Sequence, residues 1–149
     1  QYYEGRTEIE GIRDYFESIL DNVTLIDDFD VYGHLDYVVR YCPSGEKIFR
    51  MSDYKEVFEQ IFKKIIPKGK GIEINTGSLY KNMSYAHPHM DILKLYKDMG
   101  GEIITVGSDA HKPEYLCYDF ETYARDALTS LGYRYYCTFK NRKPEFNPL

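Results

Sequence analysis

The chain has 149 residues, the size of one ordinary domain and enough to bury a hydrophobic core of its own. Its 19 basic and 24 acidic side chains give a formal net charge of -5. This balance argues against nucleic acid as a general partner, although a local basic pocket is compatible with it. No apolar run approaches the roughly 18 residues that a membrane helix needs, so we expect no membrane partner.

The three cysteines, Cys42, Cys117 and Cys137, are widely spaced and include no Cys-x-x-Cys pair. An odd number of cysteines without a disulfide framework is typical of reduced thiols, so we expect a cytoplasmic protein. Because the first residue is Gln1 rather than methionine, we also expect either a trimmed chain or the carboxyl-terminal part of a longer one.

Hydrophobic periodicity and turn residues predict four helices that alternate with four strands. Thr7 is the expected cap of the first helix and Ser52 that of the second. The predicted elements are, in order, a helix over 7–22, a strand over 29–33, a helix over 52–65, a strand over 71–75, a helix over 88–99, a strand over 103–107, a helix over 120–131 and a strand over 133–139. We expect the segment 76–78 to be a polar loop and the tail at 140–149 to be irregular.

This alternation predicts an α/β fold in which parallel strands are joined by helical crossovers. Four such strands fit either a small sheet that closes off by itself or about half of a barrel of the eight-stranded type. The chain contains no interdomain linker and no low-complexity segment, so we treat residues 1–149 as a single domain.

The segment Ser108-Asp109-Ala110-His111 directly follows the apolar strand at 103–107. Residues at the carboxyl end of a buried parallel strand point into the crevice where α/β folds keep their chemistry. Asp109 and His111 are two residues apart, which in an extended segment places both side chains on one side. Since a carboxylate oxygen beside an imidazole nitrogen suits Zn, Mn or Fe, we predict that both residues bind metal.

Two other predicted strands also end in polar residues, and parallel strand ends share one edge of a sheet. His34 follows Gly33 at the end of the first strand, and we favour a metal ligand there over a half-buried structural histidine. Asp36 is expected either to orient an imidazole or to cap a helix. Asn75, at the tip of the second strand, is a candidate for hydrogen-bonding a ligand. Glu73 lies within that strand, and its role is open between structural and catalytic.

His87 and His89 flank Pro88 in a loop, and no buried strand directs them toward the other candidates. We therefore interpret both histidines as exposed or helix-capping. Arg40 lies about one helical turn beyond Asp36. It could either bind an anionic substrate at the strand edge or form a surface salt bridge.

Three segments resemble motifs of the polymerase and histidinol phosphatase (PHP) superfamily. These segments are DVYGHLD at 30–36 with Arg40 and Tyr41 after it, IEINT at 72–76, and GEIITVGSDAH at 101–111. The resemblance is closest to the histidinol-phosphate phosphatase branch, whose carboxyl terminus the segment 132–144 also resembles. It covers nearly the whole chain, in order.

The resemblance implies part of a distorted (β/α)7 TIM-like barrel with two or three divalent metal ions, Zn, Mn or Fe, at the carboxyl ends of its strands. It implies that His34, Asp109 and His111 are metal ligands and that Asp109 and His111 take part in catalysis. The remaining ligands of the family come from an amino-terminal His-x-His, further histidines and a bridging Glu. All of these precede the present motifs in the family, and Glu73 is not that bridging residue. We therefore expect the carboxyl-terminal half of a barrel, catalytically silent alone.

In the phosphatase branch, Glu-Ile-Asn-Thr is followed by an Arg-Lys pair whose Arg would bind phosphate. Here Tyr80 falls at that position, and Lys81 could take over as a point charge. Arg40 fits the second phosphate-binding arginine of the family. The implied function of the intact protein is metal-dependent hydrolysis of a small phosphomonoester, of the histidinol-phosphatase type in histidine biosynthesis, with Arg40, Asn75 and Lys81 as substrate-binding residues.

The alternative is a degenerate PHP-type half barrel that acts as a structural or ligand-binding module. In either case an open half barrel leaves strand edges unpaired, which promotes association. The expected partners are thus a small phosphorylated substrate and either the missing amino-terminal half of the barrel or a second copy of the chain.

Overall fold

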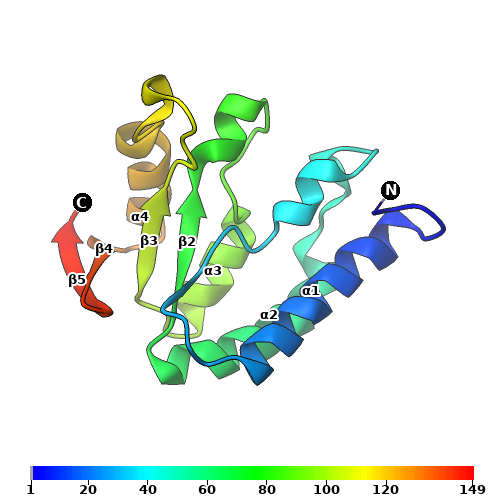
Figure 1. Ribbon diagram of the computed structural model, residues 1–149, viewed down its shortest axis with the longest axis horizontal. Helices are drawn as coiled ribbons and strands as arrows, with labels where there is room; N and C mark the ends of the chain where they lie inside the picture. The colour runs from blue at the N-terminus through cyan, green and yellow to red at the C-terminus, as the bar shows by residue number, and fades with distance from the viewer. Residues whose placement is uncertain (1) are drawn as a thin grey trace.

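A computed structural model describes residues 2–149, which form a mixed α/β fold (Figure 1). Helices and strands alternate along the chain up to α4, as the periodicity predicts. The helices are α1 (Glu8–Leu25), α2 (Met51–Ile65), α3 (Met90–Asp98) and α4 (Arg125–Ser130), and the strands are β1 (Val31–Tyr32), β2 (Gly71–Asn75), β3 (Ile104–Gly107), β4 (Tyr135–Lys140) and β5 (Lys143–Pro148).

Strands β1, β2 and β3 form one parallel sheet in that order. In the register, Ile72 of β2 lies between Tyr32 of β1 and Ile104 of β3. The expected parallel arrangement is therefore confirmed for these three strands, and α2 and α3 provide the crossovers. In Figure 1, α1 lies on one side of the sheet beyond β1, and the β4–β5 hairpin lies beyond β3.

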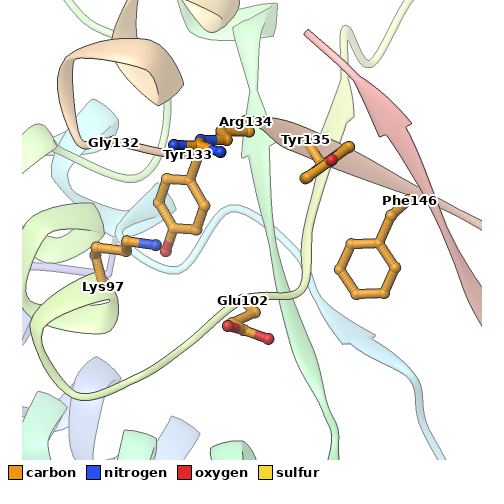
Figure 2. Close-up of a pocket in the computed structure, with 7 residues that line it drawn as sticks. All are labelled: Lys97, Glu102, Gly132, Tyr133, Arg134, Tyr135 and Phe146. Atoms are coloured by element: carbon orange, nitrogen blue, oxygen red, sulfur yellow. The ribbon is translucent and has the colours of Figure 1, made fainter.

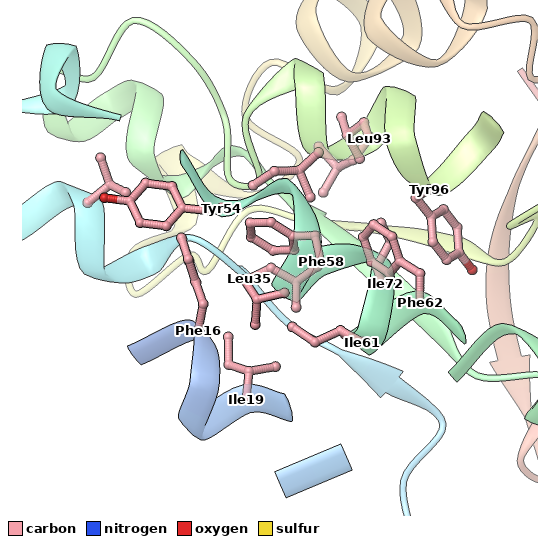
Figure 3. Close-up of a cluster of buried hydrophobic side chains, with 14 of the residues drawn as sticks. Phe16, Ile19, Leu35, Tyr54, Phe58, Ile61, Phe62, Ile72, Leu93 and Tyr96 are labelled. Atoms are coloured by element: carbon pink, nitrogen blue, oxygen red, sulfur yellow. The ribbon is translucent and has the colours of Figure 1, made fainter. Parts of the chain in front are cut away.

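The hydrophobic core lies between the sheet and helices α1 to α3 (Figure 3). Ile72 and Ile74 of β2 have no solvent exposure and belong to this core. Because strand side chains alternate, Glu73 between them points to the opposite face of the sheet. Burying an aliphatic side chain of this size contributes roughly 1.5–3 kcal/mol, so this face fixes the register of the strand that carries Asn75 at its end.

The two predicted helix caps have different outcomes. Thr7 caps α1 as expected, because its hydroxyl accepts from the Glu10 amide at 3.2 Å while the Glu10 carboxylate accepts from the Thr7 amide at 2.8 Å. Ser52 does not cap α2. The helix begins one residue earlier, at Met51, and the Ser52 hydroxyl donates to Asp53 instead.

The expected irregular tail is wrong, because residues 143–148 form β5 and pair with β4. The strand expected last in the parallel series, β4, is thus antiparallel to its partner in a second, two-stranded sheet. The turn between the two strands consists of Asn141 and Arg142, with φ angles of 50° and 61°. Two successive positive φ angles match the twist of a tight hairpin, which explains why the chain reverses here.

Two further segments differ in detail from the prediction. The expected loop at 76–78 is the beginning of a 3₁₀ helix, Thr76–Lys81, and the expected helix at 120–131 begins as a π-helical turn, Phe120–Ala124, before α4. Within residues 2–149, no helix is long and apolar enough to cross a membrane. The three cysteines are all free, with Cys42 and Cys137 buried and Cys117 exposed.

Candidate functional site at the carboxyl edge of the sheet

The carboxyl ends of the parallel strands bring the predicted site segments to one edge of the sheet. Asn75 at the end of β2 is paired in register with Gly107 at the end of β3. The loop after β1 begins at Gly33, which lies against the Glu73 side chain of β2. The segments that follow β1, β2 and β3, which the sequence predicts to carry the site, are therefore neighbours (Figure 1).

The turn that carries Asp109 and His111 is held by its own backbone. The Asp109 carbonyl accepts from the Tyr80 hydroxyl at 2.8 Å, and it lies 2.7 Å from Nδ1 of His111. Because a carbonyl can only accept, Nδ1 of His111 carries a proton. In the neutral imidazole this leaves the lone pair on Nε2, where it is available to a metal ion.

The Asp109 carboxylate lies next to a cationic pocket. Its Oδ2 atom is 3.4 Å from Nζ of Lys81, and Lys81 and Arg40 line the same cavity of about 500 Å³. The Arg40 guanidinium lies over the rings of Tyr37 and Tyr41, at 5.7 and 5.4 Å. The full lining is Arg40, Ser44, Gly45, Glu46, Lys47, Lys81, Asn82 and Met83. Arg40 and Lys81, which are predicted to bind substrate, thus line one pocket beside the predicted metal ligand Asp109.

His34 is held where β1 ends, with a φ of 31°. Its backbone amide donates to Oε2 of Glu73 at 3.3 Å, and its ring packs on Tyr37 at 4.7 Å between centroids. Its Nδ1 atom is buried and has no hydrogen-bond partner among residues 2–149. A buried imidazole nitrogen without a hydrogen-bond partner costs free energy, and a bound metal ion would supply the missing partner. This environment is the one expected of a metal-binding histidine.

Glu73 spans the face of the sheet opposite the core, at the same edge. A Cβ atom at Gly107 would lie 2.5 Å from Oε1 of Glu73, and one at Gly33 would lie 3.1 Å from Oε2. Two glycines, Gly107 at the end of β3 and Gly33 directly after β1, therefore leave the space that this carboxylate occupies. Its bonds to the His34 amide and to Nδ2 of Asn75 show a role in holding the site segments together.

Asn75 is 7% exposed, and both ends of its side-chain amide already have partners. Its Oδ1 accepts from the Gly77 amide at 3.0 Å, which caps the following 3₁₀ helix, and its Nδ2 donates to Glu73 at 3.2 Å. The role of Asn75 in binding substrate stays a prediction.

His87 was expected to be exposed or capping, and this is wrong: the residue is 1% exposed. Its Nδ1 lies 2.6 Å from Oδ1 of the fully buried Asp36, whose Oδ2 accepts from the His89 amide at 2.9 Å. Asp36 therefore does orient an imidazole, that of His87. His89 caps α3 through its ring nitrogen, as predicted. Sequence spacing gave no signal for the pair, because Asp36 and His87 are 51 positions apart.

The tyrosines around the site resist ionisation. The pKa of Tyr37 is raised, first by its 2.6 Å hydrogen bond to the Tyr41 hydroxyl and then by burial. The positive charge of Arg40 opposes this rise in the pKa, and the negative charge of Asp109 adds a smaller contribution in the raising direction. Burial also raises the pKa of Tyr85, whose ring packs edge-on against those of His87 and His89.

The predicted metal ligands do not form a closed site by themselves. Among the residues that the structure describes, no three His, Cys, Asp or Glu side chains are grouped closely enough to hold a metal ion. The nitrogen atoms available on His34 and His111 suit a metal, but the donor set that residues 2–149 supply is incomplete.

The fold and the site define a class: an α/β protein whose parallel strands gather histidine, aspartate and cationic side chains at their carboxyl edge. The PHP domain profile matches residues 1–77, more than half of the chain. The chain belongs to the PHP domain family, and its similarity lies in the histidinol-phosphatase branch.

Curated relatives of this branch come from several bacteria. The histidinol-phosphatase of Lactococcus lactis is 30% identical over 149 residues, which cover 99% of this chain and 54% of that protein. The probable histidinol-phosphatase of Thermotoga maritima is 31% identical over 135 residues, or 91% of this chain and 54% of that protein.

A solved structure has the same fold. The crystal structure of histidinol phosphate phosphatase from Lactococcus lactis, complexed with Zn, L-histidinol and phosphate, superposes with a TM-score of 0.77 at 28% identity. The match covers 97% of this chain and 54% of that one. The present chain thus spans about half the length of the relatives that it matches.

Proposed function

We propose that this chain is the carboxyl-terminal portion of a PHP-type barrel that hydrolyses a small phosphomonoester of the histidinol-phosphate kind. The observation that supports this most strongly is the cavity in which Arg40 and Lys81 lie together beside Asp109. A phosphate group needs cationic donors next to the centre where its ester bond is cleaved. The Lactococcus lactis relative, which is solved with Zn, L-histidinol and phosphate, supports the same substrate class.

In this proposal His34, Asp109 and His111 bind a divalent metal together with ligands that lie outside the present chain. Tyr80 and the Asp109 carbonyl keep His111 in the tautomer that leaves Nε2 available. Arg40 and Lys81 bind the phosphate, Arg40 as a planar fork and Lys81 as a point charge. Asn75 contributes through the loop that it caps.

The test uses the full-length protein with three variants, His34→Ala, Asp109→Asn and His111→Ala. We expect each variant to lower bound metal and to reduce turnover of histidinol phosphate by at least about 100-fold, because each removes a metal ligand. The matched control is Asp119→Asn, at a positive-φ position outside the strand edge. Unchanged metal content and turnover in all three variants would rule the assignment out.

Two variants test the phosphate pocket separately. Arg40→Gln and Lys81→Gln should raise KM for the phosphate ester by about tenfold or more while leaving bound metal unchanged. Lys94→Gln, on the exposed face of α3, is the control. A KM that is unaffected by both substitutions would show that the pocket does not bind substrate.

A degenerate half barrel with a structural or ligand-binding role is the second candidate. It is favoured by the incomplete donor set among residues 2–149. The segment encoded upstream distinguishes the two: a His-x-His in a first strand supports the enzyme, and its absence supports the degenerate module. Under both proposals the chain alone is catalytically silent, and two or more tightly bound metal ions per isolated chain would contradict this.

The proposed partner is a segment that pairs with the outer edge of β1. In the described sheet this strand has a neighbour only on the β2 side, and an unpaired parallel edge promotes association. The missing half of the barrel is the favoured occupant and a second copy of the chain the alternative, which sedimentation at several concentrations separates. We also propose a reducing, cytoplasmic location, because three widely spaced cysteines without a Cys-x-x-Cys pair are typical of reduced thiols.

A further inference from the structure

A second cavity lies at the other end of the sheet, away from the predicted catalytic edge. It has a volume of about 330 Å³, within the size range of small-molecule pockets. Glu102, in the loop before β3, belongs to this cavity, whereas Asp109 follows the same strand at its far end. The lining residues are Lys97, Glu102, Gly132, Tyr133, Arg134, Tyr135 and Phe146 (Figure 2).

The cavity carries charges of both signs that the described chain does not pair. Lys97, Glu102 and Arg134 form no ion pair with any residue in the range 2–149. The Lys97 ammonium lies over the Tyr133 ring, 4.1 Å from its centroid. A simple anion here would be repelled by Glu102 and a simple cation by Arg134, so the charge pattern matches a ligand that carries both signs.

Aromatic side chains form the remaining walls. Tyr135 and Phe146, from opposite strands of the hairpin, are 48% and 50% exposed, and their rings meet edge to face with centroids 6.5 Å apart. Tyr133 faces them across the space in Figure 2. Large aromatic surface left open in a pocket of this size is suited to a flat ring.

One wall of the cavity is tied to the rest of the fold by a hydrogen bond. The Tyr133 hydroxyl donates to the Gly101 carbonyl at 2.8 Å, which ties the start of the hairpin to the loop before β3. Burial raises the pKa of Tyr133, and the neighbouring charge of Glu102 adds to this, so the hydroxyl keeps its proton. The Tyr133 wall is therefore in place before a ligand binds, so binding does not have to order this side chain.

We propose that this cavity binds a free α-amino acid with an aromatic or imidazole side chain. The Arg134 guanidinium pairs with the ligand carboxylate, Glu102 accepts from its ammonium group, and the ring packs against Tyr135 and Phe146. Lys97, whose ammonium lies over the Tyr133 ring, adds positive charge to the cavity. This site is independent of the proposed phosphatase chemistry at the opposite edge.

The test titrates the 149-residue chain with L-phenylalanine and L-histidine by calorimetry and by amide NMR. The matched probes are phenethylamine, which lacks the carboxylate, and 3-phenylpropionate, which lacks the ammonium. We expect L-phenylalanine or L-histidine to bind saturably and at least about tenfold more tightly than either truncated probe, because each truncation leaves one charged group of the pocket unpaired.

Variants locate the site. Arg134→Gln and Glu102→Gln should each weaken binding of the amino acid by about tenfold, whereas Arg125→Gln, on the distant exposed face of α4, should not. Circular dichroism confirms that each variant is folded. Absence of saturable binding by the folded wild-type chain overturns the proposal. So does equal affinity for 3-phenylpropionate and L-phenylalanine, or binding that is insensitive to Arg134→Gln.

Discussion

Asp36 connects the loop after β1 to the segment that precedes α3, because one carboxylate oxygen meets the His87 ring and the other accepts from the His89 amide. The carboxylate has no solvent exposure. It lies two residues after His34, so the position of that predicted ligand depends on this buried contact.

Asp36→Ala should destabilise the chain by about 3 kcal/mol, because it leaves a buried imidazole nitrogen and a backbone amide without an acceptor. Urea denaturation followed by circular dichroism measures the change. The control is Asp91→Ala, since that carboxylate is exposed and lies 3.6 Å from the His89 ring. Similar losses for both variants would refute a special role of Asp36.

Tyr80 holds the turn that carries the other predicted ligands, because its single hydroxyl proton is shared between the carbonyls of Ser108 and Asp109, at 3.0 and 2.8 Å. Its ring stacks on Tyr115 with centroids 4.1 Å apart. Tyr80, which falls where the resemblance places an arginine, thus supports the turn that carries the predicted metal ligands Asp109 and His111.

Tyr80→Phe keeps the stacking and removes only the hydroxyl, so we expect a loss of about 1 kcal/mol in the free energy of unfolding. The ring resonances of His111 should also move, since the carbonyl that accepts from its Nδ1 loses its second donor. Tyr118→Phe, in the same aromatic cluster, serves as the control. An unmoved His111 spectrum would contradict the proposed support.

At the scale of single elements, the capping box formed by Thr7 and Glu10 defines the start of α1. Thr7→Ala removes the hydroxyl that accepts from the Glu10 amide and should cost about 1 kcal/mol in thermal or urea unfolding. Thr129→Ala provides a contrast in the last turn of α4, where the side chain is exposed and caps no helix start, so alanine is expected to be neutral or stabilising. If the two substitutions had the same effect, the box would not be contributing to stability.

The elements also show what could be predicted from the sequence and what could not. The helices and the three parallel strands can be predicted because their hydrophobic periodicities involve residues that are close together in the sequence. The meeting of the strand ends at one edge of the sheet can be predicted because the strands are parallel. The β5 strand was missed because its turn, Asn141-Arg142, lacks the glycine that normally marks a tight hairpin. Burial of His87 was missed because its partner is distant in sequence, and local spacing does not report such pairs.

At the scale of the whole molecule, sixteen tyrosines make the fold sensitive to alkali. Burial raises the pKa of Tyr15 to about 12, and it also raises the pKa values of Tyr54, Tyr85, Tyr96 and Tyr133. Each of these phenols has a higher pKa in the folded chain than its unfolded value of about 10. Its contribution to the stability of the fold is therefore complete below about pH 10 and is lost as the pH rises through the folded pKa.

We therefore expect the free energy of unfolding to be nearly constant between about pH 7 and 9 and to fall steeply from about pH 10 to 12. Urea titrations across this range, with tyrosinate absorbance read in parallel, measure both quantities. Tyr15→Phe should lessen the fall, whereas Tyr135→Phe, on the exposed hairpin, should leave it unchanged. Early ionisation of all tyrosines near pH 10 without loss of structure would contradict the expectation.

Arg142, in the turn between β4 and β5, bonds to Asp28 and Asp30 in the segment that leads into β1. The contact joins residues 112 positions apart along the chain. Helices form from neighbouring residues within microseconds. The contact between Arg142 and Asp30 instead closes a long loop of the chain, and this closure costs conformational entropy before the contact can form. We therefore expect docking of the hairpin turn to be a late event in folding. Since its attraction is between exposed charges, added salt should slow that last step without altering the earlier helical ones.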